Sequence, residues 1–272
     1  MIADGHIHTP FCPHGTTDSF EKYITRAVAL GFKEITFTEH APLPLSFDDS
    51  TPSKDSAMRL DVLHEYFETI TKLQEVYRSS IKINRGLEVD YIEGYEPEIS
   101  SFLTEYGPYI DDSILSVHFL KKDTDYYCLD YSPQVFNEMI ATFGGIESVY
   151  SAYYQTVLQS ITSDLGAYKP KRMGHITLVH KFQKKYPVQD SYEQEVLNIL
   201  HEMKKYNLQL DYNGAGMNKP LCLEPYPPRW VIREAIKLNL KLVYGSDAHQ
   251  AKDLGQGLVA LYPGVTLSSP TT

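Results

Sequence analysis

The residues with the clearest chemistry in this chain are histidines and carboxylates that lie where short apolar runs end. His6 and His8 follow the first such run, and Asp247 and His249 follow the last. Imidazole suits zinc, iron and similar ions, and sites that add carboxylates also admit manganese. Two or three such ions can activate a water and neutralise the charge of an attacked phosphate or carbonyl. The sequence therefore predicts a metal-dependent hydrolase.

The spacing within these groups also favours metal binding. His6 and His8 are two residues apart, and because strand side chains alternate between faces, both can bind the same ion. Asp247 and His249 have the same spacing, and a carboxylate can bridge two ions where a neutral imidazole cannot. Glu88 offers a second bridge. The predicted metal ligands are His6, His8, His14, His40, Glu88, His118, His175, Asp247 and His249.

Ligands so far apart in the chain can meet only if the elements that carry them are neighbours. Seven β-prone runs are found at 2–6, 34–38, 81–89, 113–117, 172–178, 208–213 and 242–246. Seven βα units predict a parallel sheet with helices outside it, whose active site lies at the carboxyl ends of the strands. A doubly wound open sheet stays an alternative, but ligands spread from the first strand to the last favour closure into a barrel.

Amphipathic patterns predict the helices between these strands. The first helix is expected to start at a capping box of Asp18 and Glu21 and to end at Gly31. A second covers 58–79, and two more fill 132–166 with a break at Gly144-Gly145. A further helix is expected from a capping box of Asp190 and Glu193 to residue 206, and another begins at Pro228.

Length and composition limit the class of protein. The 272 residues suit one barrel domain spanning 1–272, since such barrels commonly take about 250 residues. A net charge of −10 disfavours nucleic-acid binding, and no apolar run reaches the roughly 20 residues that span a membrane. The absence of a signal-peptide pattern and three widely spaced cysteines favour the cytoplasm. The 21 tyrosines could include an interface, so a homo-oligomer stays open.

Taken together, the motifs resemble those of the polymerase and histidinol phosphatase (PHP) family. The four motifs occur in order as His6-Ile7-His8, Thr38-Glu39-His40, Ser116-Val117-His118 and Asp247-Ala248-His249. The resemblance covers essentially the whole chain, and the stretch 86–91 is similar to the histidinol-phosphatase branch. It implies an α/β fold, a single-domain distorted (β/α)7 TIM-like barrel, which agrees with the seven strands counted independently.

The resemblance also implies three divalent metal ions, which could be zinc, iron or manganese. The first ion would take His6, His8, Glu88 and Asp247, and the second would share Glu88 and take His118 and His175. The third would take His14, His40 and His249, with Asp247 extending toward it. Cys12, His64, His180 and His201 are not expected to bind metal.

The activity implied is hydrolysis of L-histidinol phosphate to L-histidinol and phosphate, a step of histidine biosynthesis. Glu88 and Asp247 would position a metal-bridging hydroxide as the nucleophile. Arg172 is a candidate for binding the phosphate, and Asn213 for the amino or imidazole group of this small phosphorylated substrate; an exposed arginine and an Asn-Gly turn are the structural alternatives. Another small phosphate monoester or a nucleotide, an amidohydrolase-like C–N hydrolysis, and a non-enzymatic metal-binding role remain as alternatives.

Overall fold

Seven parallel strands form the frame of the fold in the computed structural model, which describes residues 3–271. The order of the strands in the sheet, β1-β2-β3-β4-β7-β8-β9, follows their order along the chain. The bounds are β1 Ala3–Ile7, β2 Glu34–His40, β3 Lys82–Asp90, β4 Asp112–Ser116, β7 Arg172–Met173, β8 Gln209–Asn213 and β9 Leu242–Gly245. The predicted distorted (β/α)7 barrel is confirmed; Ile2, the predicted start of the first strand, lies outside the described residues.

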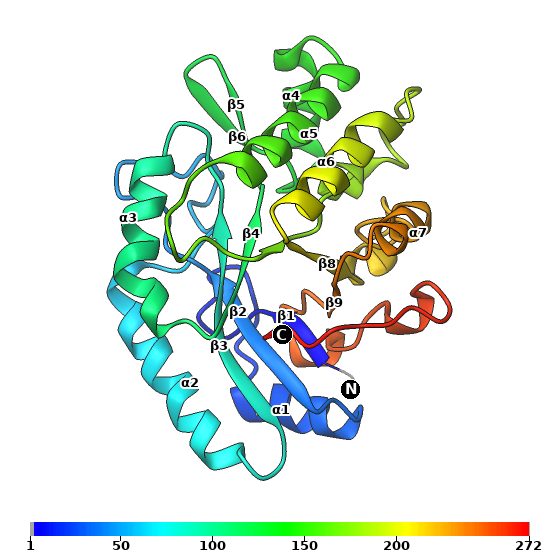
Figure 1. Cartoon of the computed structure of the whole chain (residues 1–272). Helices are drawn as coiled ribbons and strands as arrows, with labels where there is room; N and C mark the ends of the chain where they lie inside the picture. The colour runs from blue at the N-terminus through cyan, green and yellow to red at the C-terminus, as the bar shows by residue number, and fades with distance from the viewer. Residues whose placement is uncertain (1–2, 272) are drawn as a thin grey trace.

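The two outer strands of the sheet, β1 and β9, lie side by side and nearly close the barrel (Figure 1). Ile7 pairs with Ala248 in a parallel bridge just past the end of β9. The backbone N–H of Asp247 donates to the carbonyl of His6 at 2.7 Å, and that of His8 donates to Ala248 at 3.0 Å. The open-sheet alternative is therefore wrong, and the first and last predicted ligands lie at one end of the barrel.

Helices cover the outside of this barrel (Figure 1). Helix α2, for example, buries one stripe of apolar side chains, Leu63, Tyr66, Phe67, Ile70 and Leu73, and packs against β3. The helices are α1 Phe20–Ala29, α2 Leu63–Tyr77, α3 Glu96–Tyr106, α4 Pro133–Phe143, α5 Ile146–Thr162, α6 Glu193–Lys205 and α7 Arg229–Lys237. The predicted break at Gly144-Gly145 is confirmed, and both glycines have positive φ.

The helix starts differ from the two predicted capping boxes. Ser19 precedes α1, and no side chain caps that helix. The Asp18 carboxylate instead accepts from Lys22 and from the backbone N–H of Ala251, a tertiary contact that the local pattern could not indicate. Tyr192 precedes α6, again without a side-chain cap, so Asp190 does not cap that helix.

One α-helix and one hairpin were not predicted, and one strand is shorter than expected. Helix α3 and the antiparallel hairpin of β5 (Phe119–Lys122) and β6 (Asp125–Cys128) follow the third and fourth strands. The predicted strand at 172–178 ends at Met173. Beyond it, the N–H of Leu178 donates to the carbonyl of His175, and the N–H of His180 donates to the carbonyl of Thr177. The chain therefore turns into the short helix η3, Leu178–Phe182, and does not extend the sheet.

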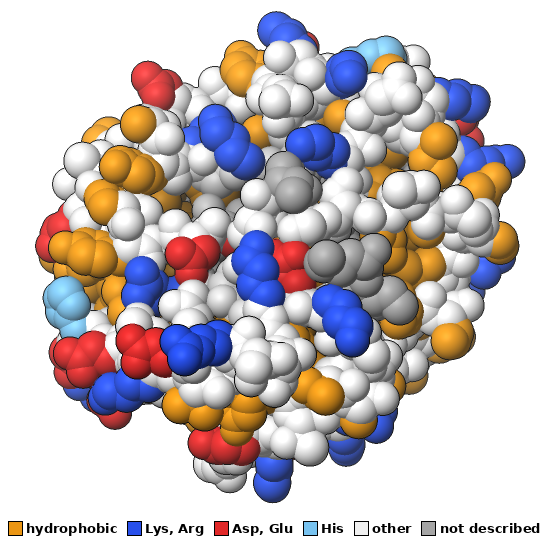
Figure 2. Space-filling view, turned by 60° about the horizontal axis from the view of Figure 1, so that its bottom comes forward, with side chains coloured by type: hydrophobic (Ala, Val, Ile, Leu, Met, Phe, Trp, Pro, Cys, Tyr) orange, Lys and Arg blue, Asp and Glu red, His pale blue; other side chains and the backbone are white. Residues whose placement is uncertain are grey.

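The surface is mixed in character on the face that Figure 2 shows. Lysine and arginine side chains are dispersed there among acidic and apolar ones, and histidine shows only near its edge. Among residues 3–271, no helix combines the length and apolar content that crossing a bilayer requires.

Candidate metal centre

All nine predicted metal ligands come together at the carboxyl end of the barrel strands. Their side chains are carried by strand ends or by the residues just beyond them, apart from that of His14, which lies in the loop after β1. Closure between β1 and β9 brings His8 to within 3.2 Å of Asp247, measured from Nε2 to Oδ1. Ligands from opposite ends of the chain are thus neighbours in space.

Glu88 is the centre of this cluster and is fully buried. Its carboxylate oxygens lie within 4 Å of ring nitrogens of five histidines. The distances are 3.3 Å to His6, 3.5 Å to His8, 3.2 Å to His40, 3.9 Å to His118 and 3.0 Å to His175. The hydroxyl of Ser116 donates to Oε1 of Glu88 at 2.6 Å. This placement suits the bridging role predicted for Glu88.

Asp247 occupies the second central position. Its Oδ1 atom lies 3.2 Å from Nε2 of His8, 3.8 Å from that of His6 and 3.6 Å from Nδ1 of His249. The residue has a φ of 52°, a left-handed conformation that is uncommon outside glycine. Such strain is held by the surrounding structure and is found at functional sites, where it can aim a side chain.

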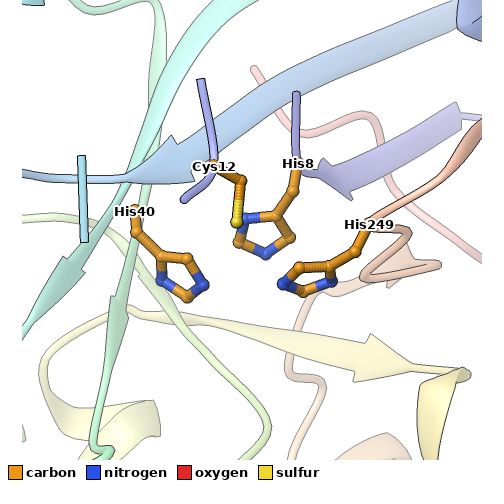
Figure 3. Close-up of side chains that lie close together, drawn as sticks. All are labelled: His8, Cys12, His40 and His249. Atoms are coloured by element: carbon orange, nitrogen blue, oxygen red, sulfur yellow. The ribbon is translucent and has the colours of Figure 1, made fainter. Parts of the chain in front are cut away.

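A third group of side chains lies at the outer edge of the cluster. Nε2 of His14 lies 3.2 Å from Nε2 of His249, and the rings of His14 and His40 are 5.1 Å apart. Figure 3 shows His8, Cys12, His40 and His249 pointing toward one another, and their ligand atoms all lie within 4.8 Å. Cys12, which was not expected to bind metal, is therefore within reach of a cation here.

The polar atoms that face the centre of the cluster fit metal ions. Buried atoms without a hydrogen-bond partner include Nε2 of His6, Nε2 of His8, Nδ1 of His40 and Oε2 of Glu88. Buried polar groups without partners are rare, and here their lone pairs converge on a shared space. Three further groups have ligand atoms within 4.8 Å of one another: His6, His8 and Asp247; Glu88, His118 and His175; and His40, Asp90 and His118. Nitrogen and oxygen donors in this arrangement suit zinc, iron or manganese.

A second layer of acceptors orients the histidine rings. Nδ1 of His6 lies 2.9 Å from Asp211, that of His8 lies 3.3 Å from Glu39, and that of His118 lies 2.7 Å from Asp90. Each contact turns Nε2 toward the centre, as outer carboxylates do in many metal sites. Sequence reasoning assigned no role to these three carboxylates. The available signal was their strand position, since Asp90 follows Glu88 by two residues and so faces the same way.

The pKa values of the clustered groups are shifted in both directions, and burial holds the pKa of His40 and that of His249 well below the usual range. Burial by itself would lower the pKa of His8, but hydrogen bonds to Asp247 and Glu39 raise it to about 9. In the same way, the Asp90 carboxylate outweighs burial and raises the pKa of His118 to about 10. Burial would raise the pKa of Glu88, but the surrounding histidines, His6 first, hold it well below its usual range. A cation that binds His8 or His118 is therefore expected to displace a proton from the ring.

Arg172 does not lie where a phosphate-binding residue should. Its side chain is fully buried in the barrel, where Nη2 donates to the carbonyl of Gly5 at 2.7 Å and to Oδ2 of Asp112 at 2.7 Å. It begins β7, at the end of the strand remote from the ligands, and it does not line the cavity over the cluster. The exposed-arginine alternative is equally wrong, because Arg172 is the largest of the fully buried side chains.

Asn213 also faces inward, away from the position expected of a substrate contact. Its side-chain N–H donates to Asp211 at 3.2 Å and to Oδ2 of Asp247 at 3.1 Å, and its oxygen accepts from the N–H of Ala215 at 2.9 Å. With both ends of the amide engaged, Asn213 is placed to orient Asp247, and its predicted substrate contact is not supported by this geometry.

A cavity of about 430 Å³ opens over the cluster. Its walls include six of the predicted ligands, namely His14, His40, His118, His175, Asp247 and His249. The cavity is also lined by Asp130, Lys181 and Tyr226, which sequence reasoning did not single out. A small molecule in this cavity would have direct access to the metal-binding atoms.

Known proteins are similar to this chain both in sequence and in fold. A family model described as the PHP domain matches residues 4–215. The chain is 50% identical to the Histidinol-phosphatase of Bacillus subtilis (strain 168) over 254 residues, which cover 93% of this chain and 95% of the relative.

Two solved structures extend this similarity to the fold. One is a protein of Listeria monocytogenes named as a candidate histidinol phosphatase, with 40% identity, a TM-score of 0.90, and coverage of 95% of this chain and 99% of that one. The other is a histidinol phosphate phosphatase of Lactococcus lactis complexed with zinc, L-histidinol and phosphate. It has 23% identity, a TM-score of 0.69, and coverage of 92% of this chain and 87% of that one, and it bears on the fold alone.

Proposed function

The chain belongs to the PHP family, and from this membership we propose that it hydrolyses L-histidinol phosphate to L-histidinol and phosphate, a step of histidine biosynthesis. It is a metal-dependent phosphomonoesterase. The observation that carries the proposal is the convergence of six histidines on the buried carboxylates Glu88 and Asp247 beneath an open cavity, in a chain half identical to a histidinol-phosphatase.

Three divalent ions are the occupants that we propose for the cluster. The first would be held by His6, His8, Glu88 and Asp247, the second by Glu88, His118 and His175, and the third by His14, His40 and His249. The orphaned ring nitrogens and the short distances around Glu88 support the first two sets, and the His14–His249 contact supports the third. Zinc, iron and manganese all suit these donors.

When bound, such ions supply an activated water near neutral pH and neutralise the charge that develops on the phosphate. The protein's own residues set the geometry for this chemistry. Glu88 and Asp247 are the residues that we propose to position the attacking water. Ser116 holds one oxygen of Glu88 and Asn213 holds one oxygen of Asp247, which leaves the other oxygen of each facing the histidines. Such fixed carboxylates spare the reaction the cost of reorganising them.

We further propose that residues 1–272 work as a single PHP-type phosphatase domain in the cytoplasm. The family model ends at residue 215, yet Asp247 and His249 follow β9 and contact the ligands of β1, which supports including the last strand in the domain. The three cysteines are free and buried, as suits a reducing compartment.

Phosphate release from L-histidinol phosphate by metal-reconstituted protein tests the function. We expect turnover that a His8→Ala variant loses almost entirely, while His201→Ala, on the exposed side of α6, keeps it. A panel of other small phosphate monoesters and nucleotides serves as the comparison. A much higher kcat/KM for a nucleotide would overturn the assignment in favour of another PHP phosphoesterase, and failure to cleave any ester would favour a non-enzymatic metal-binding role.

A further inference from the structure

The lining of the cavity over the metal ligands contains a lysine with no role so far. Lys181 lines this cavity together with His175 and Asp247. Its Nζ atom lies 2.8 Å from Oδ2 of Asp130, and the two side chains are only 21% and 20% exposed. The ion pair is thus largely sheltered, and what exposure it keeps is in the wall of the cavity.

The backbone holds Lys181 in a defined position relative to the metal cluster. Lys181 lies in η3, which begins three residues after the predicted ligand His175. The hydroxyl of Tyr153, a residue of α5, donates to the carbonyl of His175 at 3.0 Å and accepts from the N–H of Leu178 at 3.1 Å. One buried side chain therefore ties the metal ligand to the start of the short helix that carries the lysine.

The Asp130 carboxylate stabilises the positive charge of Lys181. Burial alone would lower the pKa of Lys181, but the Asp130 carboxylate outweighs burial and raises it. An ammonium group has three N–H donors, and among residues 3–271 the one hydrogen bond that Lys181 donates through this group goes to Asp130. The other two N–H groups remain to bind an acceptor in the cavity.

The chemistry of the substrate indicates what that acceptor is. A phosphate monoester carries up to two negative charges, and carboxylates of Asp55, Asp90 and Asp130 in the same cavity would repel it. Among the described residues that line the cavity, the lysines are Lys181 and Lys219, and there is no arginine; Lys219 is exposed. Arg172 is buried elsewhere, as described above.

We propose that the ammonium group of Lys181, paired with Asp130, binds the phosphoryl oxygens of the substrate within the cavity that the metal ligands also line. This role rests on the proposed function, because it assigns the phosphate site of the same reaction. It takes the place of the phosphate contact that the sequence suggested for Arg172.

Direct binding of inorganic phosphate, measured by calorimetry on metal-reconstituted protein of known metal content, tests this role without relying on turnover. We expect Lys181→Gln to weaken phosphate binding by about 10- to 100-fold, in keeping with the loss of a charged hydrogen bond, while metal content stays unchanged. KM for L-histidinol phosphate should rise in parallel. Lys219→Gln, the matched control, should change phosphate affinity by less than about fivefold, as for exposed charges.

Lys181→Met, whose unbranched side chain fills similar space, replaces the glutamine variant if that variant does not fold. Wild-type phosphate affinity in either folded, metal-loaded variant would overturn the role of Lys181. Phosphate binding that depends on Lys181 in a protein that does not cleave L-histidinol phosphate would instead overturn the proposed substrate and leave the phosphate site standing.

Discussion

Nδ1 of His6 lies 2.9 Å from Oδ2 of Asp211, and both side chains are fully buried. The two residues come from β1 and β8, strands that are not hydrogen-bonded neighbours, so the contact spans the inside of the barrel. It leaves Nε2 of His6 as the atom that faces Glu88. The orientation of His6, a predicted metal ligand on β1, thus depends on the carboxylate of Asp211, which lies 205 residues later in the chain.

Asp211→Asn should weaken metal binding by about 10- to 100-fold, because the outer carboxylate fixes the ring and raises its basicity. Metal content after dialysis against a buffered series of free zinc concentrations provides the measurement. Asp190→Asn, at an exposed position, is the control and should retain wild-type affinity. Equal affinities in the two variants would show that Asp211 does not orient His6.

Removal of the metals should abolish phosphate release and also lower the thermal stability of the protein. Metals that bind only the folded state stabilise it by about 3 kcal/mol at a hundredfold excess over Kd. Without them, Glu88 and its histidines keep buried atoms that have no partner. Thermal melts of chelated and reconstituted protein test this, and an unchanged Tm would mean that the cluster binds metal only weakly.

Metal binding should release protons. The pKa of His8 is raised to about 9 and that of His118 to about 10, so both rings are protonated in the metal-free protein at about pH 7.5. Metal requires the neutral ring, so a lower pH should weaken binding and a higher pH should strengthen it. Calorimetric titration in two buffers that differ in heat of ionisation measures the protons released. Identical heats in both buffers would contradict the prediction.

Arg172→Met should destabilise the fold by about 3–5 kcal/mol, because it leaves the buried Asp112 carboxylate without its partner. The folded fraction should retain the wild-type KM for L-histidinol phosphate, in contrast to the rise expected for Lys181 variants. Denaturant unfolding and steady-state kinetics check the two parts. Arg59→Met removes an exposed arginine for comparison and should leave stability nearly unchanged. A raised KM without loss of stability would instead indicate that Arg172 binds the substrate.

Gly174→Ala should impair the metal centre even though it adds a single methyl group. A Cβ at this position would overlap the Oγ atom of Ser116, the hydroxyl that donates to Glu88. We expect a loss of about 1–3 kcal/mol of stability and weaker metal binding, measured by unfolding and metal titration. Adding Ser116→Ala removes the nearest of the overlapping atoms, although Cγ2 of Ile114 still lies 2.9 Å from the added Cβ, so the double variant should be more stable than the sum of the two single effects.

The sequence predicted most of the fold because its signals are local. Alternation placed His6 and His8 on one face of a strand, and helical spacing located the helix that buries Leu63 and Ile70. The hairpin of β5 and β6 was missed, since four-residue strands with exposed, charged positions carry little apolar periodicity. The strand predicted at 172–178 was too long because its β-prone composition concealed the hydrogen bonds of η3.

The sequence by itself determined which metal-binding side chains are present and that they follow the predicted strands in order. This was possible because side-chain alternation and the ends of strands can be recognised from residues that are adjacent in the chain. Only the tertiary structure decided which side chains share a cavity. Arg172 and Lys181 are both basic and both close to His175 in the sequence. Arg172 is nevertheless buried at the far end of the barrel, whereas Lys181 lines the cavity over the ligands. The reason is that strand direction and packing across the barrel, which depend on contacts between distant segments, determine where each side chain points.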